Sequence, residues 1–144
     1  MRISFNPMVK LSLFTALVAI VGCSPLMATF DQASYSQVTS LKVDALALMD
    51  KSVEDYSSRT ADVAALQLEL NKAIEYDKHR PKNQITNEMW TLMSDSTGHL
   101  LGGFLVKWKK DGKESAFYLK EKEKQVGEAF DQIAELEIKK IKSN

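Results

Sequence analysis

The chain contains little of what stiffens or interrupts a fold: one cysteine, three prolines and six glycines in 144 residues. A single cysteine forms no internal disulfide, so stability must come from a packed core, which the apolar share of 44% can supply. Because so few prolines and glycines interrupt the chain, its long unbroken runs favour α-helix. Basic and acidic residues balance at 19 each, which lacks the positive excess of nucleic-acid-binding proteins. We expect no nucleic-acid partner.

Residue patterns that carry catalysis or bind metal are also missing. The two histidines, His79 and His99, belong to no HExxH and to no cysteine–histidine ligand spacing. A metal site would require the fold to bring them together with Asp77, Asp95 or Glu88. The one pair of adjacent glycines lacks the lysine and hydroxyl residue of a phosphate-binding P-loop. The sequence therefore predicts no catalytic residue, no cofactor and no metal ligand, and an enzyme is the less favoured interpretation.

The N-terminus has the three zones of an export signal. Residues 1–10 carry Arg2 and Lys10 without an acid, and residues 11–22 are apolar or small throughout. A positive segment followed by a short apolar segment is typical of a secretory signal peptide. Twelve helical residues reach only about 18 Å, short of the ~30 Å hydrocarbon core. A cleaved signal is thus favoured over a permanent membrane-spanning helix.

The apolar segment ends in Ile20-Val21-Gly22-Cys23, which resembles the lipobox of bacterial lipoproteins. The resemblance implies that the Cys23 thiol receives a diacylglyceryl group, that cleavage precedes Cys23, and that the new amine is acylated with a fatty acid such as palmitate. It also implies, from Ser24 in a Gram-negative host, an outer-membrane location, with the domain on the periplasmic face. The alternative is a plain secretory signal cut after Ala28, but Leu26 would then stand where a small residue is wanted.

The sequence divides into three parts on this interpretation. Residues 1–22 form the lipoprotein signal peptide, residues 23–33 the lipidated N-terminus and tether, and residues 34–144 the folded domain. Removing the signal leaves 17 basic and 19 acidic residues, a net charge near −2. Ten extended tether residues reach at most about 35 Å, so the domain is expected to stay close to its membrane.

The domain has the periodicity of an all-α bundle of four to five helices. Apolar residues at three- and four-residue steps predict helices over residues 34–55, 59–78, 86–94, roughly 99–110, and 115–142. Pro81 predicts a break after the second, and the predicted N-terminal caps are Ser57 or Ser58, Thr86 and Ser115. The residues expected to face inward at the element ends include Val53, Tyr56, Phe117, Ile138 and Ile141.

The stretch "LLGGFLVKWKKDGK", residues 100–113, supports two interpretations. Two adjacent glycines cost a helix about 2 kcal/mol relative to alanine, which close packing or a kink would explain. Alternatively the stretch is a surface for an anionic bilayer or a partner helix. That surface would consist of an apolar strip with a basic border: Leu101, Phe104, Leu105 and Trp108, with Lys107, Lys109, Lys110 and Lys113.

A second candidate is the loop "HRPKNQITNEMW", residues 79–90. Three of its side chains, Arg80, Lys82 and Asn83, are suited to a carboxylate or sugar-like ligand beside Trp90. A turn of this composition also forms without any ligand. Both interpretations stay open from the sequence.

The pattern "FDQASYSQVTSLKVDALALMDKS … KN … W … LLGGFLVKWK" is similar to that of small helical lipoproteins of the bacterial envelope. The resulting hypothesis is a membrane-anchored lipoprotein that binds or scaffolds another envelope component. Two alternatives are a membrane-active or exclusion factor and a small enzyme without a recognisable motif. The expected partners are the lipid bilayer, through Cys23, and another envelope protein.

Overall fold

A computed structural model describes residues 27–143 as a bundle of five α-helices without strands in that range. The helices are α2 (Gln32–Met49), α3 (Thr60–Lys78), α4 (Gln84–Ser94), α5 (Leu101–Asp111) and α6 (Ala116–Lys139). Short 3-10 turns follow α2 (Asp50–Val53), precede α3 (Tyr56–Arg59) and follow α6 (Lys140–Ser143). The predicted all-α bundle of four to five helices is confirmed.

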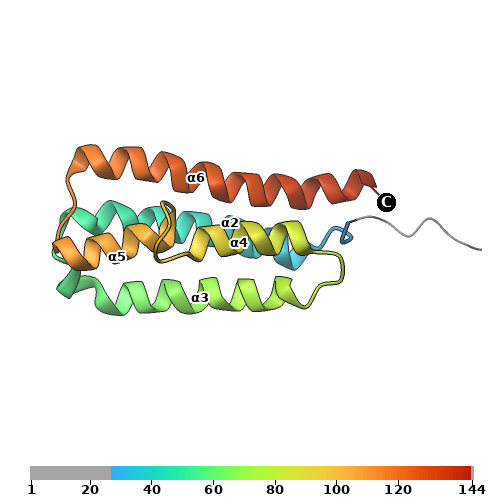
Figure 1. Cartoon of the computed structure of the whole chain (residues 1–144), viewed down its shortest axis with the longest axis horizontal. Coiled ribbons are helices and arrows are strands. Elements are labelled where there is room, and N and C mark those ends of the chain that lie inside the picture. Colours follow the sequence, from blue (N-terminus) through green and yellow to red (C-terminus); the bar gives the residue numbers. More distant parts are fainter. Residues whose placement is uncertain (1–26, 144) are drawn as a thin grey trace, which may run out of the picture.

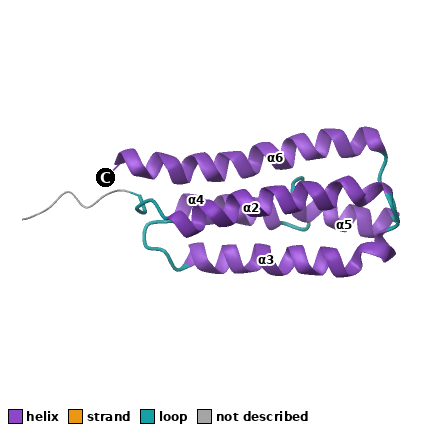
Figure 2. Ribbon diagram, turned by 180° about the vertical axis from the view of Figure 1, so that it is seen from behind, coloured by secondary structure: helices purple, strands orange, loops and turns teal. Residues whose placement is uncertain are grey.

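The helices run up and down in four positions, the third of which is divided between α4 and α5 (Figure 1). The pairs α2–α3, α3–α4, α4–α6 and α6–α2 pack against each other, which gives a four-cornered bundle. Seen from behind, α2 covers α4 and α5 (Figure 2). One end of the bundle therefore brings together the start of α2, the α3–α4 loop and the end of α6.

Local sequence explains where several helices begin and end. The Asp31 carboxylate accepts a hydrogen bond from the Ser34 amide and caps α2, and Ser115 caps α6 as predicted. α3 ends at Lys78, shortly before Pro81. The predicted caps at Ser57, Ser58 and Thr86 are wrong. Asp55 caps the turn that leads into α3, and the residue preceding α4 is Asn83.

The core is one continuous cluster supplied by all five helices. Its members follow the predicted helical stripes: Val38, Leu41, Ala45, Leu48, Met49, Val63, Leu66, Leu70, Ala73, Trp90, Met93, Leu101, Phe104, Leu105, Trp108, Leu119, Val126, Phe130 and Ile133. Both tryptophans are completely buried. Burial of these side chains supplies the main driving force for folding.

Four residues predicted to face inward are exposed instead: Val53, Phe117, Ile138 and Ile141. Val53 follows the last α-helical residue of α2, so the stripe does not continue to it. Phe117 is nine residues, or two and a half turns, from buried Val126 and therefore faces the opposite side of α6. Tyr56 is half-buried, with its ring packed edge-on against Trp108 at 5.3 Å.

Candidate functional site

The 79–90 loop turns its polar side chains into the bundle. The Arg80 side chain is only 11% exposed and forms ion pairs with Asp77 at 3.0 Å and Glu137 at 2.9 Å. Asn83 is buried, and its amide donates to the backbone and side chain of Asp77. Completely buried Trp90 donates its indole N–H to Asp77 Oδ2 at 2.7 Å. The polar groups of Arg80, Asn83 and Trp90 thus bind partners inside the domain, and a ligand at this loop stays a prediction.

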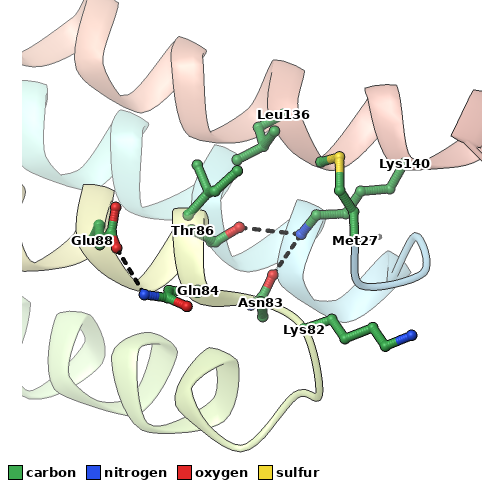
Figure 3. A pocket seen from close by; sticks show the side chains of 9 residues that line it. Met27, Lys82, Asn83, Gln84, Thr86, Glu88, Leu136 and Lys140 are labelled. Carbon is green, nitrogen blue, oxygen red and sulfur yellow. Dashed lines mark hydrogen bonds between the residues drawn. The ribbon is translucent and has the colours of Figure 1, made fainter. Parts of the chain in front are cut away.

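Lys82, the fourth predicted residue, behaves differently. It occupies the left-handed region, with φ of 61°, at the apex of the loop, and it is exposed. Its side chain points away from the buried groups (Figure 3). Of the predicted loop set, this lysine alone keeps a solvent-facing position.

Lys140 lies at the centre of a second group of buried polar side chains next to Arg80 and Asp77. Its side chain is 2% exposed, and its ammonium donates to Asn83 Oδ1 at 2.7 Å, Thr86 Oγ1 at 3.1 Å and Glu137 Oε2 at 2.5 Å. With Asp77 and Arg80, the network contains two acids and two bases, so the buried charges are balanced. Such groups stabilise a structure only when their partners are complete. We call the set Ser34, Asp77, Arg80, Asn83, Thr86, Trp90, Glu137 and Lys140 the polar network.

The electrostatics of the polar network favour the charged form of Arg80. Burial alone would lower the pKa of Arg80, but hydrogen bonds and charges from Glu137 and Asp77 outweigh it and raise that pKa. The guanidinium also donates to the Ser34 hydroxyl at 2.7 Å. Arg80 therefore acts as a permanently charged link between α2, α3 and α6.

The polar network also binds the segment that precedes α2. The Ala28 amide donates to the Lys82 carbonyl at 3.0 Å, and Arg80 donates to the Thr29 carbonyl at 2.5 Å. The Asp31 amide donates to Glu137 Oε1 at 2.7 Å. Ala28–Asp31 is thus part of the folded domain, and Gln32 and Ala33 already belong to α2. The folded domain therefore includes Ala28–Ala33, which the sequence analysis assigned to the tether.

A hollow of about 360 Å³ lies beside the polar network, between the start of α4 and the end of α6 (Figure 3). Its polar part contains Asn83, Thr86 and Lys140. Its apolar part is formed by Met27, Ile85 and Leu136, which come from three separate segments. The hollow therefore combines an apolar rim with a buried cation.

The predicted apolar strip on α5 is wrong as a solvent-facing surface. The side chains of Leu101, Phe104, Leu105 and Trp108 are between 0% and 4% exposed. They fill the core because α5 completes the third corner of the bundle. The Trp108 indole donates to the Glu54 carbonyl at 3.2 Å.

The border lysines of the predicted strip are nevertheless near the surface. Lys109 and Lys110 are exposed. Lys107 bonds to both Asp111 and Glu114, and its pKa is raised by those two partners. Its ammonium also lies 4.7 Å from the centre of the Tyr118 ring. Lys107 therefore links α5 to the start of α6.

The two glycines of α5 allow a close backbone approach. A Cβ added to Gly102 would lie 2.3 Å from the Ser94 carbonyl oxygen, and one added to Gly103 would lie 1.9 Å from the Gly98 carbonyl oxygen. No real Cβ occupies such positions without a backbone shift. The close-packing interpretation of the glycine pair is confirmed.

The histidines do not meet. His79 and His99 are both exposed, and His79 contacts Glu75 at 2.8 Å, one helical turn away. Within residues 27–143, no three histidine or carboxylate side chains are grouped as metal ligands.

The polar network contains residues that the sequence analysis did not select: Ser34, Glu137 and Lys140. Glu137 and Lys140 continue the three- and four-residue steps of Phe130 and Ile133 along the inner side of α6. This spacing could have identified both residues as buried from the sequence. Charged residues at core-facing positions of a helix require partners inside the fold.

Cys23 and the lipobox-like residues before it lie outside the described residues. Among residues 27–143, no helix has the length and apolarity needed to cross a membrane. No protein-family model, curated protein or solved structure matches the chain.

Proposed function

We propose that the protein is a bacterial lipoprotein in which acylated Cys23 holds a small helical bundle at the envelope membrane. The observation that carries this proposal is the Ile20–Cys23 pattern directly after a basic and then apolar N-terminus. One acyl chain binds a membrane only marginally, whereas two or more anchor it stably. The triacylated cysteine of the lipoprotein family would therefore be a stable anchor.

The proposed role of the bundle is binding or scaffolding of another envelope component. Support comes from how the polar groups of the 79–90 loop are used: Arg80, Asn83 and Trp90 bind structural partners within the domain. The α5 strip, predicted as a surface for a bilayer or for a partner helix, belongs to the core, so neither role depends on it. A binding module is the hypothesis that the arrangement supports best.

Intact mass of the membrane-extracted protein tests the anchor, with wild type compared to Cys23→Ser. The expected result is a chain that begins at Cys23 and carries acyl mass, absent in the variant. An unmodified chain beginning near Thr29 in both samples would refute the lipoprotein proposal. Ser24→Asp serves as a sorting control, since the family resemblance implies that this change moves an outer-membrane lipoprotein to the inner membrane.

A further inference from the structure

The fixed start of the domain determines which end lies near an anchor. Ala28 is 5% exposed, and three hydrogen bonds hold Ala28, Thr29 and Asp31 against the bundle. Only Ser24–Met27 separates Cys23 from this fixed segment. From Cys23 to Met27 a chain reaches at most about 14 Å, even when fully extended.

The same end of the bundle presents apolar side chains to solvent. Ile85, in the first turn of α4, is 54% exposed, and Met27 and Leu136 are half-buried beside it around the hollow. Exposed Lys82, at the loop apex, lines the same hollow, and exposed Lys142 lies in the 3-10 turn that follows α6. We call Met27, Ile85 and Leu136 the tether-end face.

We propose that the tether-end face lies against the phospholipid bilayer that holds the anchor. This inference depends on the proposed lipidation of Cys23. A bundle tied within about 14 Å of its acyl chains meets that surface at a very high effective concentration. The short segment between Cys23 and the domain therefore keeps the tether-end face next to the bilayer.

The chemistry of the face suits the membrane interface. Apolar side chains can enter the boundary between headgroups and acyl chains, while neighbouring lysines keep their ammonium groups at the phosphates. The polar network behind the face keeps this end rigid, because it ties α2, α3, α4 and α6 together through Arg80 and Lys140. Contact would therefore position the whole bundle, with the start of α6 at the end farthest from the membrane (Figure 1).

Site-specific quenching tests the orientation in the full lipidated protein. Ile85→Cys is labelled with a bimane fluorophore, since acylation leaves Cys23 no free thiol. The protein is reconstituted in vesicles of phosphatidylethanolamine and phosphatidylglycerol that include nitroxide-labelled lipid. The matched control is Leu92→Cys, 63% exposed and seven residues along the same side of α4. Phe117→Cys, at 83% exposure, reports the opposite end.

The expected result is at least about threefold stronger quenching at position 85 than at 92, because the two differ by about 10 Å along the helix. The nitroxide lipid should not quench the label at position 117, so its fluorescence should match that in vesicles without nitroxide. Equal quenching at 85 and 92, or none at 85, would overturn the proposed orientation. Mass spectrometry of the same samples separates the two proposals: acylated protein without quenching at 85 refutes only the orientation, whereas protein without acyl mass refutes both.

Discussion

Trp90 donates its indole N–H to Asp77 at 2.7 Å, and both side chains are at most 1% exposed. The other carboxylate oxygen of Asp77 accepts from the Ser34 hydroxyl at 2.5 Å and from Arg80 at 3.0 Å. A carboxylate buried this deeply is tolerated because both of its oxygens accept hydrogen bonds. Asp77 is the point at which α2, α3 and α4 are joined.

Trp90→Phe should lower the free energy of unfolding by about 2 kcal/mol or more, because it leaves a buried charged acceptor without its donor. Trp108→Phe is the matched control, since it removes the same atoms from another completely buried tryptophan. Trp108 donates to a neutral carbonyl, that of Glu54. Its variant should therefore lose about 1 kcal/mol less in urea denaturation. Equal losses would show that the bond to Asp77 has no special strength.

Arg80→Met should destabilise the domain by about 3 kcal/mol, because Asp77 and Glu137 would keep buried charges without their shared cation. Arg80→Lys should recover only part of the loss, since an ammonium lacks the planar fork that reaches several acceptors at once. Thermal unfolding of the three proteins measures both effects.

Arg59→Met is the control, because it removes an arginine whose ion pairs lie on the surface. Arg59 pairs with Glu54 and Asp62 on the surface, where ion pairs contribute little. Its variant should unfold near the wild-type temperature. If Arg59→Met and Arg80→Met lowered that temperature equally, the buried pairs would not be responsible.

Helix positions and most of the core could be predicted because they depend on local periodicity, as in Val38–Met49 and Val63–Ala73. The polar network could not, because Arg80 finds Ser34 and Glu137 at separations of 46 and 57 residues. The local sequence is the same whether a loop arginine binds a ligand or pairs with side chains of distant helices, so it does not distinguish the two cases. The α5 strip was similarly ambiguous, since an apolar stripe does not reveal whether neighbouring helices cover it.

The phenylalanines of α6 test how helical register determines burial. Phe130→Ala should lower the free energy of unfolding by about 3–5 kcal/mol, because it empties a completely buried site beside Trp90. Phe117→Ala should change it by no more than about 0.5 kcal/mol, since that ring is 83% exposed. Urea denaturation compares them directly. A large loss at Phe117 would mean that the ring is packed against something in solution.

Gly103→Ala should destabilise the protein by about 2 kcal/mol or more, although alanine is the better helix former. The added methyl would collide with the Gly98 carbonyl oxygen and force α5 away from the α4–α5 loop. Gly127→Ala in α6 is the opposite case, with its nearest atoms, in Leu46 and Lys42, at 3.8 Å. It should stabilise the protein by nearly 1 kcal/mol. Two changes of the same sign would contradict the close approach.

Asp31 should make the stability of the domain depend on acid pH. Burial alone would raise the pKa of Asp31, but bonds from the Ser34 amide and Tyr76 hydroxyl and the charge of Arg80 lower it below its usual 3.8. The folded state therefore favours the carboxylate. Its contribution is complete above pH 3.8 and is lost as the pH falls through the folded-state pKa.

Asp31→Asn keeps an N-terminal cap and removes the charge, so it isolates this effect. The variant should be about 0.5–1 kcal/mol less stable than wild type at pH 6, and the difference should shrink as the pH falls below 3.8. Tyr76→Phe removes one donor to Asp31, at 3.1 Å, so it should bring the folded-state pKa closer to 3.8 and make the acid-dependent loss smaller. Denaturant titrations across the acid range measure the difference, and a gap that stays constant with pH would show that the Asp31 charge does not hold the start of α2.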